Sequence, residues 1–129
     1  MKWMDRERSF WVIGGDLRQR ALARLLREDG HTVHIAGLEG EGLEPEPLGP
    51  GLALAHCVIL PLPVAVGESF VHTPLSAAHL PLAQVLDCLR PGQLVCGGMV
   101  APAVAAEMTR RGLRWALIGC VVYLLLILA

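Results

Sequence analysis

The chain has 129 residues, a formal net charge of −1 at pH 7 and 53% hydrophobic residues. This length allows one domain with its own hydrophobic core, and the balanced charge excludes the strongly basic surface of most nucleic-acid-binding proteins. Residues 1–9 are rich in charged side chains and lack the apolar stretch of a secretory signal. We therefore expect a cytoplasmic protein that begins with an N-terminal arm.

The first half of the chain predicts two strands around one helix. Apolar and β-branched runs predict strands at residues 10–13 and 32–36. A helix is predicted over 17–29, because apolar residues recur there at helical spacing and Gly30 suits its C-terminal cap. The residues expected on its buried face are Leu17, Ala21, Leu22, Leu25 and Leu26. Residues 38–51 are rich in glutamate, proline and glycine, which predicts a solvated loop.

The second half continues the alternation of strands and helices. The expected elements are a strand at 57–60 that could extend to 62, a loop at 63–78, a helix at 80–89, a strand at 94–96, a helix at 102–111 and a fifth strand that could occupy 113–118. Such alternation predicts an α/β fold. We expect a Rossmann-like three-layer domain over residues 10–114, with a mostly parallel sheet of about five strands.

A glycine turn, residues 14–19 with the sequence GGDLRQ, joins the first predicted strand to the first helix. It is not a G-x-G-x-x-G fingerprint, and the Asp16 carboxylate would repel a pyrophosphate, so we expect no NAD(P) here. Asp16 is a favoured N-cap residue, and Gln19 is its capping-box partner by spacing. Arg18 opposes the helix dipole in the first turn. Two interpretations stay open: Arg18 holds a carboxylate or phosphate, or it is turned to solvent or paired with Asp16.

The cysteines and histidines show no metal-binding pattern, and we expect no metal site. The cysteines Cys57, Cys88, Cys96 and Cys120 include no C-x-x-C pair, so we expect buried, reduced thiols. For the scattered histidines we expect structural or surface roles at His31, His34, His56, His72 and His79. His72 is the best candidate for an exception, because its loop follows the third predicted strand.

Four segments in order resemble the N-terminal domain of the A subunit of dipicolinate synthase. They are VIGGDLRQ at 12–19, VILPLP at 58–63, TPLS at 73–76 and GQLV with two glycines at 92–98. The resemblance implies part of a two-subunit enzyme of spore-forming bacteria that uses NADP to oxidise a dihydrodipicolinate-type precursor to dipicolinate. It also implies a Rossmann-like fold, a mother-cell location, and a second domain that carries the nicotinamide fingerprint.

The resemblance further implies a substrate-binding cleft at the carboxyl edge of the sheet, where ligands of parallel sheets bind. The residues expected to line it are Gly14, Gly15, Asp16, Arg18, Pro63, Thr73, Ser76, Gly97 and Gly98. A cationic fork such as Arg18 suits a pyridine-type dicarboxylate. After Pro63 the family tends to have a small hydroxyl residue, whereas residues 64–68 here read VAVGE, so a polar contact is expected to be lost.

Within the chain no second glycine fingerprint follows, so we expect a truncated domain that carries no cofactor itself. NADP is expected in the whole family enzyme, with the B subunit or a cofactor domain as the partner. The alternative is a stand-alone domain that binds a small ligand or a protein partner, with or without a membrane tether.

Residues 115–129 form an uncharged apolar tail. Three interpretations stay open for it: a short membrane anchor, a buried final strand, or the end of a truncated or frameshifted family member. A membrane-spanning helix usually needs about 20 apolar residues, which is more than this tail supplies.

Overall fold

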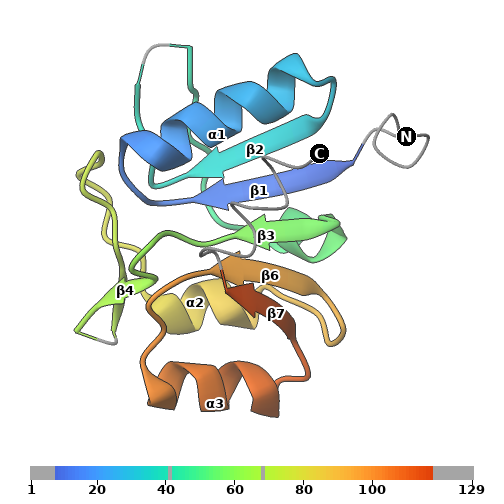
Figure 1. Ribbon diagram of the computed structural model, residues 1–129, viewed down its shortest axis with the longest axis vertical. Coiled ribbons are helices and arrows are strands. Elements are labelled where there is room, and N and C mark those ends of the chain that lie inside the picture. Colours follow the sequence, from blue (N-terminus) through green and yellow to red (C-terminus); the bar gives the residue numbers. More distant parts are fainter. Residues whose placement is uncertain (1–7, 41, 68, 118–129) are drawn as a thin grey trace.

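The computed structural model describes residues 8–40, 42–67 and 69–117. A five-stranded sheet lies at its centre, with the strand order β2-β1-β3-β6-β7 and parallel pairing throughout (Figure 1). The strands are β1 (Ser9–Ile13), β2 (Thr32–Ala36), β3 (Cys57–Ile59), β6 (Leu94–Gly97) and β7 (Arg114–Leu117). The predicted α/β fold with a parallel sheet of about five strands is confirmed.

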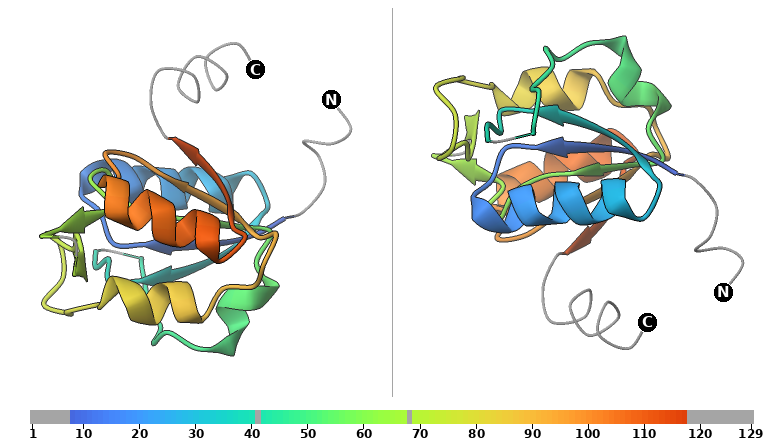
Figure 2. Two further views of the ribbon diagram at one scale, coloured as in Figure 1. Left: turned by 90° about the horizontal axis from the view of Figure 1, so that it is seen from below. Right: turned by 90° about the horizontal axis from the view of Figure 1, so that it is seen from above.

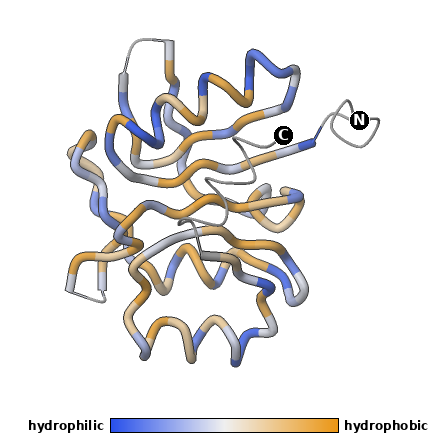
Figure 3. Tube along the Cα trace, in the orientation of Figure 1, coloured by the Kyte–Doolittle hydropathy of each residue, from blue (hydrophilic) through white to orange (hydrophobic). Residues whose placement is uncertain are grey.

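Helices cover both faces of the sheet, which makes the predicted three layers. Helix α1 (Leu17–Glu28) packs on one face, while α2 (Leu82–Asp87), α3 (Pro102–Arg110) and the 3-10 helix η1 (Pro50–Leu54) contribute to the core on the other. Figure 2 shows α1 on the opposite side of the sheet from α2 and η1. Hydrophobic residues follow the central strands, and hydrophilic residues are frequent along α1 (Figure 3).

Helix α1 meets the sheet with part of the face that its apolar spacing predicts. Leu22 and Leu26 pack against the core as expected. Leu17 and Leu25 are 58% and 61% exposed, whereas Gln19 and Ala23 are buried. The Gln19 side chain lies 3.4 Å from the carbonyl oxygen of Ile59, to which it donates a hydrogen bond. Gln19 therefore joins α1 to the end of β3 instead of closing a capping box. Asp16 caps the helix as expected, since its side chain accepts from the backbone N–H of Arg18.

The long connection after β2 is anchored more firmly than a solvated loop. Leu38 and Leu43 are buried, and the Glu46 N–H donates to the carbonyl oxygen of Ile35 at 2.6 Å. Leu52 of η1 is completely buried in the core that α2 and α3 share. The prediction of full solvation is wrong because apolar residues at intervals hold this connection against the sheet.

The segment 63–78 contains a small antiparallel hairpin that the sequence did not predict. Its strands are β4 (Ala65–Val66) and β5 (Phe70–Val71). Helix α2 begins at Leu82 and not at residue 80, because the preceding residues pair with this hairpin: the Val71 N–H donates to the Leu80 carbonyl oxygen at 2.9 Å. Two-residue strands leave too little periodicity to be recognised from sequence.

The first residues of the apolar tail complete the sheet. Strand β7 pairs with β6 from Arg114 to Leu117, so the expected fifth strand is present. Most of the tail, residues 118–129, and the arm at 1–7 lie outside the described residues. Among the described residues, no helix has both the length and the apolar character needed to cross a bilayer.

An ion-pair cluster joins α2 to α3. Glu107 accepts hydrogen bonds from Arg110 and, at 2.8 Å, from Nε of Arg111, and Arg111 also reaches Asp87 on α2 at 2.6 Å. Hydrogen bonds from Arg110 first and Arg111 second lower the pKa of Glu107 from 4.5 to about 2. These ion pairs therefore contribute to stability above pH 4.5, and the contribution is lost as the pH falls toward 2.

We expect an NMR titration of the Glu107 carboxyl carbon to give a midpoint near pH 2. In a double variant, Arg110→Ala with Arg111→Ala, the midpoint should rise toward the ordinary range of a glutamate, because both donors are gone. A midpoint that is the same in the two proteins would contradict this assignment.

Candidate functional site at the carboxyl edge of the sheet

Three segments meet where the parallel strands end, as the sequence predicts. The Gly15 N–H donates to the His72 carbonyl oxygen at 2.8 Å, which joins the turn after β1 to the segment 63–78. The Val64 N–H donates to the carbonyl oxygen of Gly98 at 3.0 Å, which joins the same segment to the turn after β6. The structure thus brings the predicted site segments together at one edge.

The glycine turn is covered by the chain itself. Gly14 has a φ of +64°, and its N–H donates to the Ala36 carbonyl oxygen at 2.8 Å. A Cβ atom at Gly14 would lie 2.6 Å from the carbonyl oxygen of His72 and 2.9 Å from Cγ1 of Val71. The N–H groups of Gly14 and Gly15 are therefore both used within the fold, and only glycine allows the segment 63–78 to approach so closely.

Asp16 and Arg18 form an ion pair at the start of α1. The Arg18 side chain donates from Nη2 to Oδ2 of Asp16 at 2.8 Å and from Nε to Oδ1 at 3.1 Å. These side-chain hydrogen bonds are the main reason why the pKa of Asp16 is below its ordinary value, and the backbone N–H of Arg18 adds to the effect. Of the two interpretations of Arg18, the pairing with Asp16 is the one observed.

The same guanidinium also contacts the segment that follows β3. Nη2 of Arg18 donates to the carbonyl oxygen of Leu62 at 3.1 Å, and the side chain is 65% exposed. Among the described residues, Nη1 of Arg18 makes no hydrogen bond. Arg18 is held on one side by the protein and has two further N–H groups to offer on the other.

The other predicted site residues shape this edge. The Thr73 hydroxyl donates to the Ala78 carbonyl oxygen at 3.0 Å, and the hydroxyl oxygen of Ser76 accepts from the Ala78 N–H at 3.0 Å. Pro63 follows a cis peptide bond. A Cβ atom at Gly97 would lie 2.7 Å from Cγ2 of Val64, so this glycine permits close packing.

An apolar hollow of about 190 Å³ lies beside this edge, lined in part by Val64, Met99 and Val104. Met99 has a φ of +50° and is 73% exposed. Met99 was not among the residues expected at the site. Its position directly after Gly97 and Gly98 at a strand end is the signal that could have found it.

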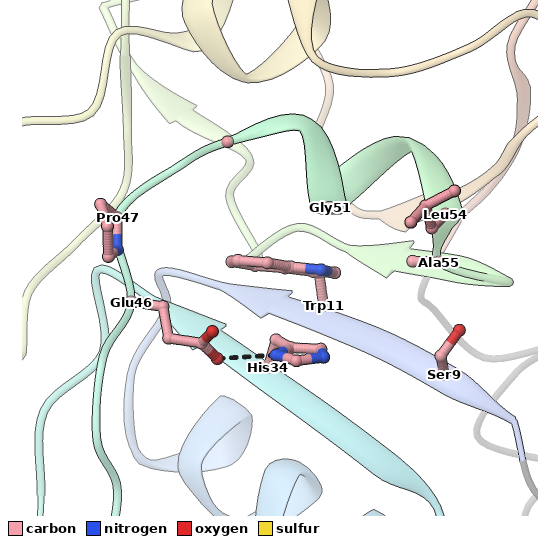
Figure 4. Close-up of a pocket in the computed structure, with 9 residues that line it drawn as sticks. Ser9, Trp11, His34, Glu46, Pro47, Gly51, Leu54 and Ala55 are labelled. Carbon is pink, nitrogen blue, oxygen red and sulfur yellow. Dashed lines mark hydrogen bonds and ion pairs between the residues drawn. The ribbon is translucent and has the colours of Figure 1, made fainter.

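A second cavity, of about 450 Å³, lies over β1 and β2 on the face opposite α1. Trp11 stacks on His34 with 5.0 Å between the ring centroids, and Nδ1 of His34 lies 2.8 Å from the Glu46 carboxylate (Figure 4). Gly51 of η1 lies close to the Trp11 ring. This arrangement ties the connection after β2 to the sheet, and it agrees with the structural role expected for His34.

A family model described as the N-terminal domain of the dipicolinate synthase A subunit matches residues 9–118. The chain belongs to this family. Most of the motif residues that carry the resemblance meet at the carboxyl edge, whereas Gly92 and Gln93 lie in the turn before β6. A search of curated protein sequences found no match.

Two solved structures of dipicolinate synthase A subunits share the fold. The crystal structure of the dipicolinate synthase A chain from Bacillus subtilis matches with a TM-score of 0.74 and 20% identity over 88% of this chain. The dipicolinate synthase A subunit from Bacillus halodurans matches with a TM-score of 0.70 and 16% identity over 84%. The match covers 40% and 39% of those two chains, so this chain spans about two fifths of their length.

The glycine turn does not fit the NADP that the family resemblance implies for the whole enzyme. A dinucleotide site needs free N–H groups at the turn to face the pyrophosphate. Here Ala36 and His72 occupy those N–H groups, and the Asp16 carboxylate stands at the helix start. Among residues 8–40, 42–67 and 69–117, no cluster of three or more histidine, cysteine or acidic side chains could hold a metal ion.

Proposed function

We propose that this domain supplies the substrate side of a dipicolinate synthase cleft. In this role it binds the dicarboxylate at the carboxyl edge of the sheet and contributes to the NADP-dependent oxidation of dihydrodipicolinate to dipicolinate. The reaction takes place in the mother-cell cytoplasm during sporulation. A cofactor domain or the B subunit holds the nicotinamide, because the glycine turn of this chain is covered by the segment 63–78.

The observation that carries this proposal is the position of Arg18. Its guanidinium is fixed by Asp16 and by the Leu62 carbonyl oxygen, so little rotamer freedom is left to lose when a ligand binds. Nη1 remains available to a carboxylate of the substrate. Arg18 thus combines a preset orientation with high exposure, which suits recognition of a planar dicarboxylate.

The neighbouring hollow supports the same role. Val64 lies two residues after Leu62, whose carbonyl oxygen accepts from Arg18, and it lines the apolar space beside Met99. A pyridine-type ring has an apolar face and charged carboxylates at its rim. In the proposed complex Arg18 holds a carboxylate and the ring lies toward the hollow, while Thr73 and Ser76 keep the segment 63–78 in shape.

Replacing Arg18 with alanine is expected to weaken the binding of pyridine-2,6-dicarboxylate about 10- to 100-fold, the usual effect of losing hydrogen bonds to a charged group. Isothermal titration calorimetry on the chain measures this change. Arg18→Lys should recover part of the affinity, because it keeps the charge but loses the planar fork. The N-cap survives in both variants, since Asp16 accepts from the backbone N–H of residue 18.

Arg110→Ala is the matched control. It removes the same charge from an exposed side chain at the C-terminal end of α3, away from the carboxyl edge, and should leave the affinity unchanged. Absence of binding by the unmodified chain at millimolar ligand would refute the proposal. An equal loss in Arg18→Ala and Arg110→Ala would show that only the overall charge matters.

A further inference from the structure

Two thiols meet on the face of the sheet that α1 covers. Cys57 of β3 and Cys96 of β6 lie on neighbouring strands, with 3.5 Å between their Sγ atoms. Both are free thiols, and both belong to or pack against the core cluster below α1. A pair of thiols at this distance offers two sulfur ligands to one thiophilic atom.

The distance between the sulfurs discriminates among such atoms. With metal–sulfur bonds of about 2.3 Å, two thiolates on a linear two-coordinate ion lie about 4.6 Å apart. Two thiolates on a tetrahedral ion lie about 3.8 Å apart. Pyramidal arsenic(III) has narrower angles and needs a slightly shorter separation. The observed 3.5 Å therefore suits arsenic(III) without movement of the strands. A disulfide would require the sulfurs to close to about 2 Å.

The number of protein ligands at this pair also favours arsenic(III) over zinc. Among the described residues, no third histidine, cysteine or acidic side chain joins the pair to form a metal-binding group. A structural zinc site needs four protein ligands. An arsenical that keeps its own organic substituent needs only two sulfurs.

An open cavity gives access to one of the two sulfurs. Cys57 is 7% exposed and lines an open cavity of about 660 Å³, whose charged lining residues are Arg8, Asp29, Arg90 and Arg114. The contact with Cys96 and burial raise the pKa of Cys57, so this sulfur is held as a neutral thiol. Either thiol can donate the hydrogen bond between the two sulfurs, and this contact lowers the pKa of Cys96.

We propose that Cys57 and Cys96 form a dithiol site that binds trivalent organic arsenicals through both sulfurs. One sulfur bonds to arsenic, and the other then closes the chelate. With an arsenoxide, two S–H bonds and the As–O bonds break, two As–S bonds form, and one water molecule leaves. Arsenic stays trivalent, so no oxidant or reductant takes part.

Phenylarsine oxide is the probe, used on the full chain with Cys88→Ser and Cys120→Ser to remove the other thiols. We expect intact-mass analysis to show one arsenical per chain that survives excess monothiol and is removed by a small dithiol. Closing a chelate raises the effective affinity about 100-fold or more over a single thiol. In the same background, Cys57→Ser and Cys96→Ser should each lose the adduct when monothiol is present.

Circular dichroism tests whether each variant is folded. If a serine variant does not fold, Cys57→Ala or Cys96→Ala replaces it. Retention of the adduct in folded single variants would overturn the proposal. So would a folded parent that takes up no arsenical. Neither result bears on dicarboxylate binding, because the side chain of Arg18 is held by Asp16 and Leu62 and not by either thiol.

Discussion

Gly14→Ala is expected to lower the free energy of unfolding by about 3 kcal/mol or more. A φ of +64° alone costs an alanine about 1–2 kcal/mol. The new Cβ atom would also lie 2.6 Å from the His72 carbonyl oxygen, which is backbone and cannot rotate away. The segment 63–78 must then move from the glycine turn and weaken the hydrogen bond from the Gly15 N–H. Urea unfolding followed by circular dichroism measures the loss.

Gly67→Ala separates the two causes of this loss. Gly67 has nearly the same φ, +63°, but a Cβ atom there would meet no atom of the described residues within 4 Å. We expect Gly67→Ala to lower the free energy of unfolding only by the cost of the left-handed backbone conformation, about 1–2 kcal/mol. Equal decreases in the free energy of unfolding for the two variants would mean that the contact with His72 does not affect stability.

Gln93→Leu is the second change with a large expected effect, about 3 kcal/mol or more. Gln93 is 1% exposed, and its Nε2 donates to the carbonyl oxygens of Leu52 at 2.6 Å and Ala55 at 3.0 Å. Its Oε1 accepts from the Arg90 N–H at 3.1 Å. Leucine has a similar size but removes all three hydrogen bonds, and each one lost costs about 1 kcal/mol, or more where a buried group is left without a partner. The Leu52 carbonyl oxygen still accepts from the Ala55 N–H at 3.2 Å. Denaturant unfolding reports this loss.

Gln84→Leu is the control for this substitution. Gln84 is exposed on α2, so the same chemical change there should alter the free energy of unfolding by no more than about 0.5 kcal/mol. A small effect of Gln93→Leu, close to that of Gln84→Leu, would contradict the role of Gln93 as the link between η1 and the turn before β6.

The central strands and the order of the helices could be predicted because their signals are local. Residues 32–36 are rich in β-branched side chains and end at Gly37, and the structure places β2 there. Pro102 marks the start of α3, and Gly112, with a φ of +73°, follows its end. These residues act through their own backbone preferences, so neighbours far along the chain have little influence.

The orientation of α1 and the hairpin of β4 and β5 could not be predicted in this way. Leu17 and Leu25 satisfy helical spacing but remain exposed, while Gln19 turns inward and donates to the Ile59 carbonyl oxygen. Strands β4 and β5 exist because each pairs with the other and because Val71 also bonds to Leu80. Such contacts depend on segments that the chain brings together only when it folds.

The glycine turn at residues 14–19 has some properties that follow from the sequence alone and others that follow only from the tertiary structure. The sequence by itself determined that this turn follows a strand, starts a helix with an Asp16 cap and lacks a nucleotide fingerprint, since residue type and spacing decide those properties. Only the tertiary structure decided that His72 covers the turn and that Arg18 also binds the Leu62 carbonyl oxygen. The reason is physical: a hydrogen bond between distant segments depends on how the strands are ordered in the sheet, which no local pattern encodes.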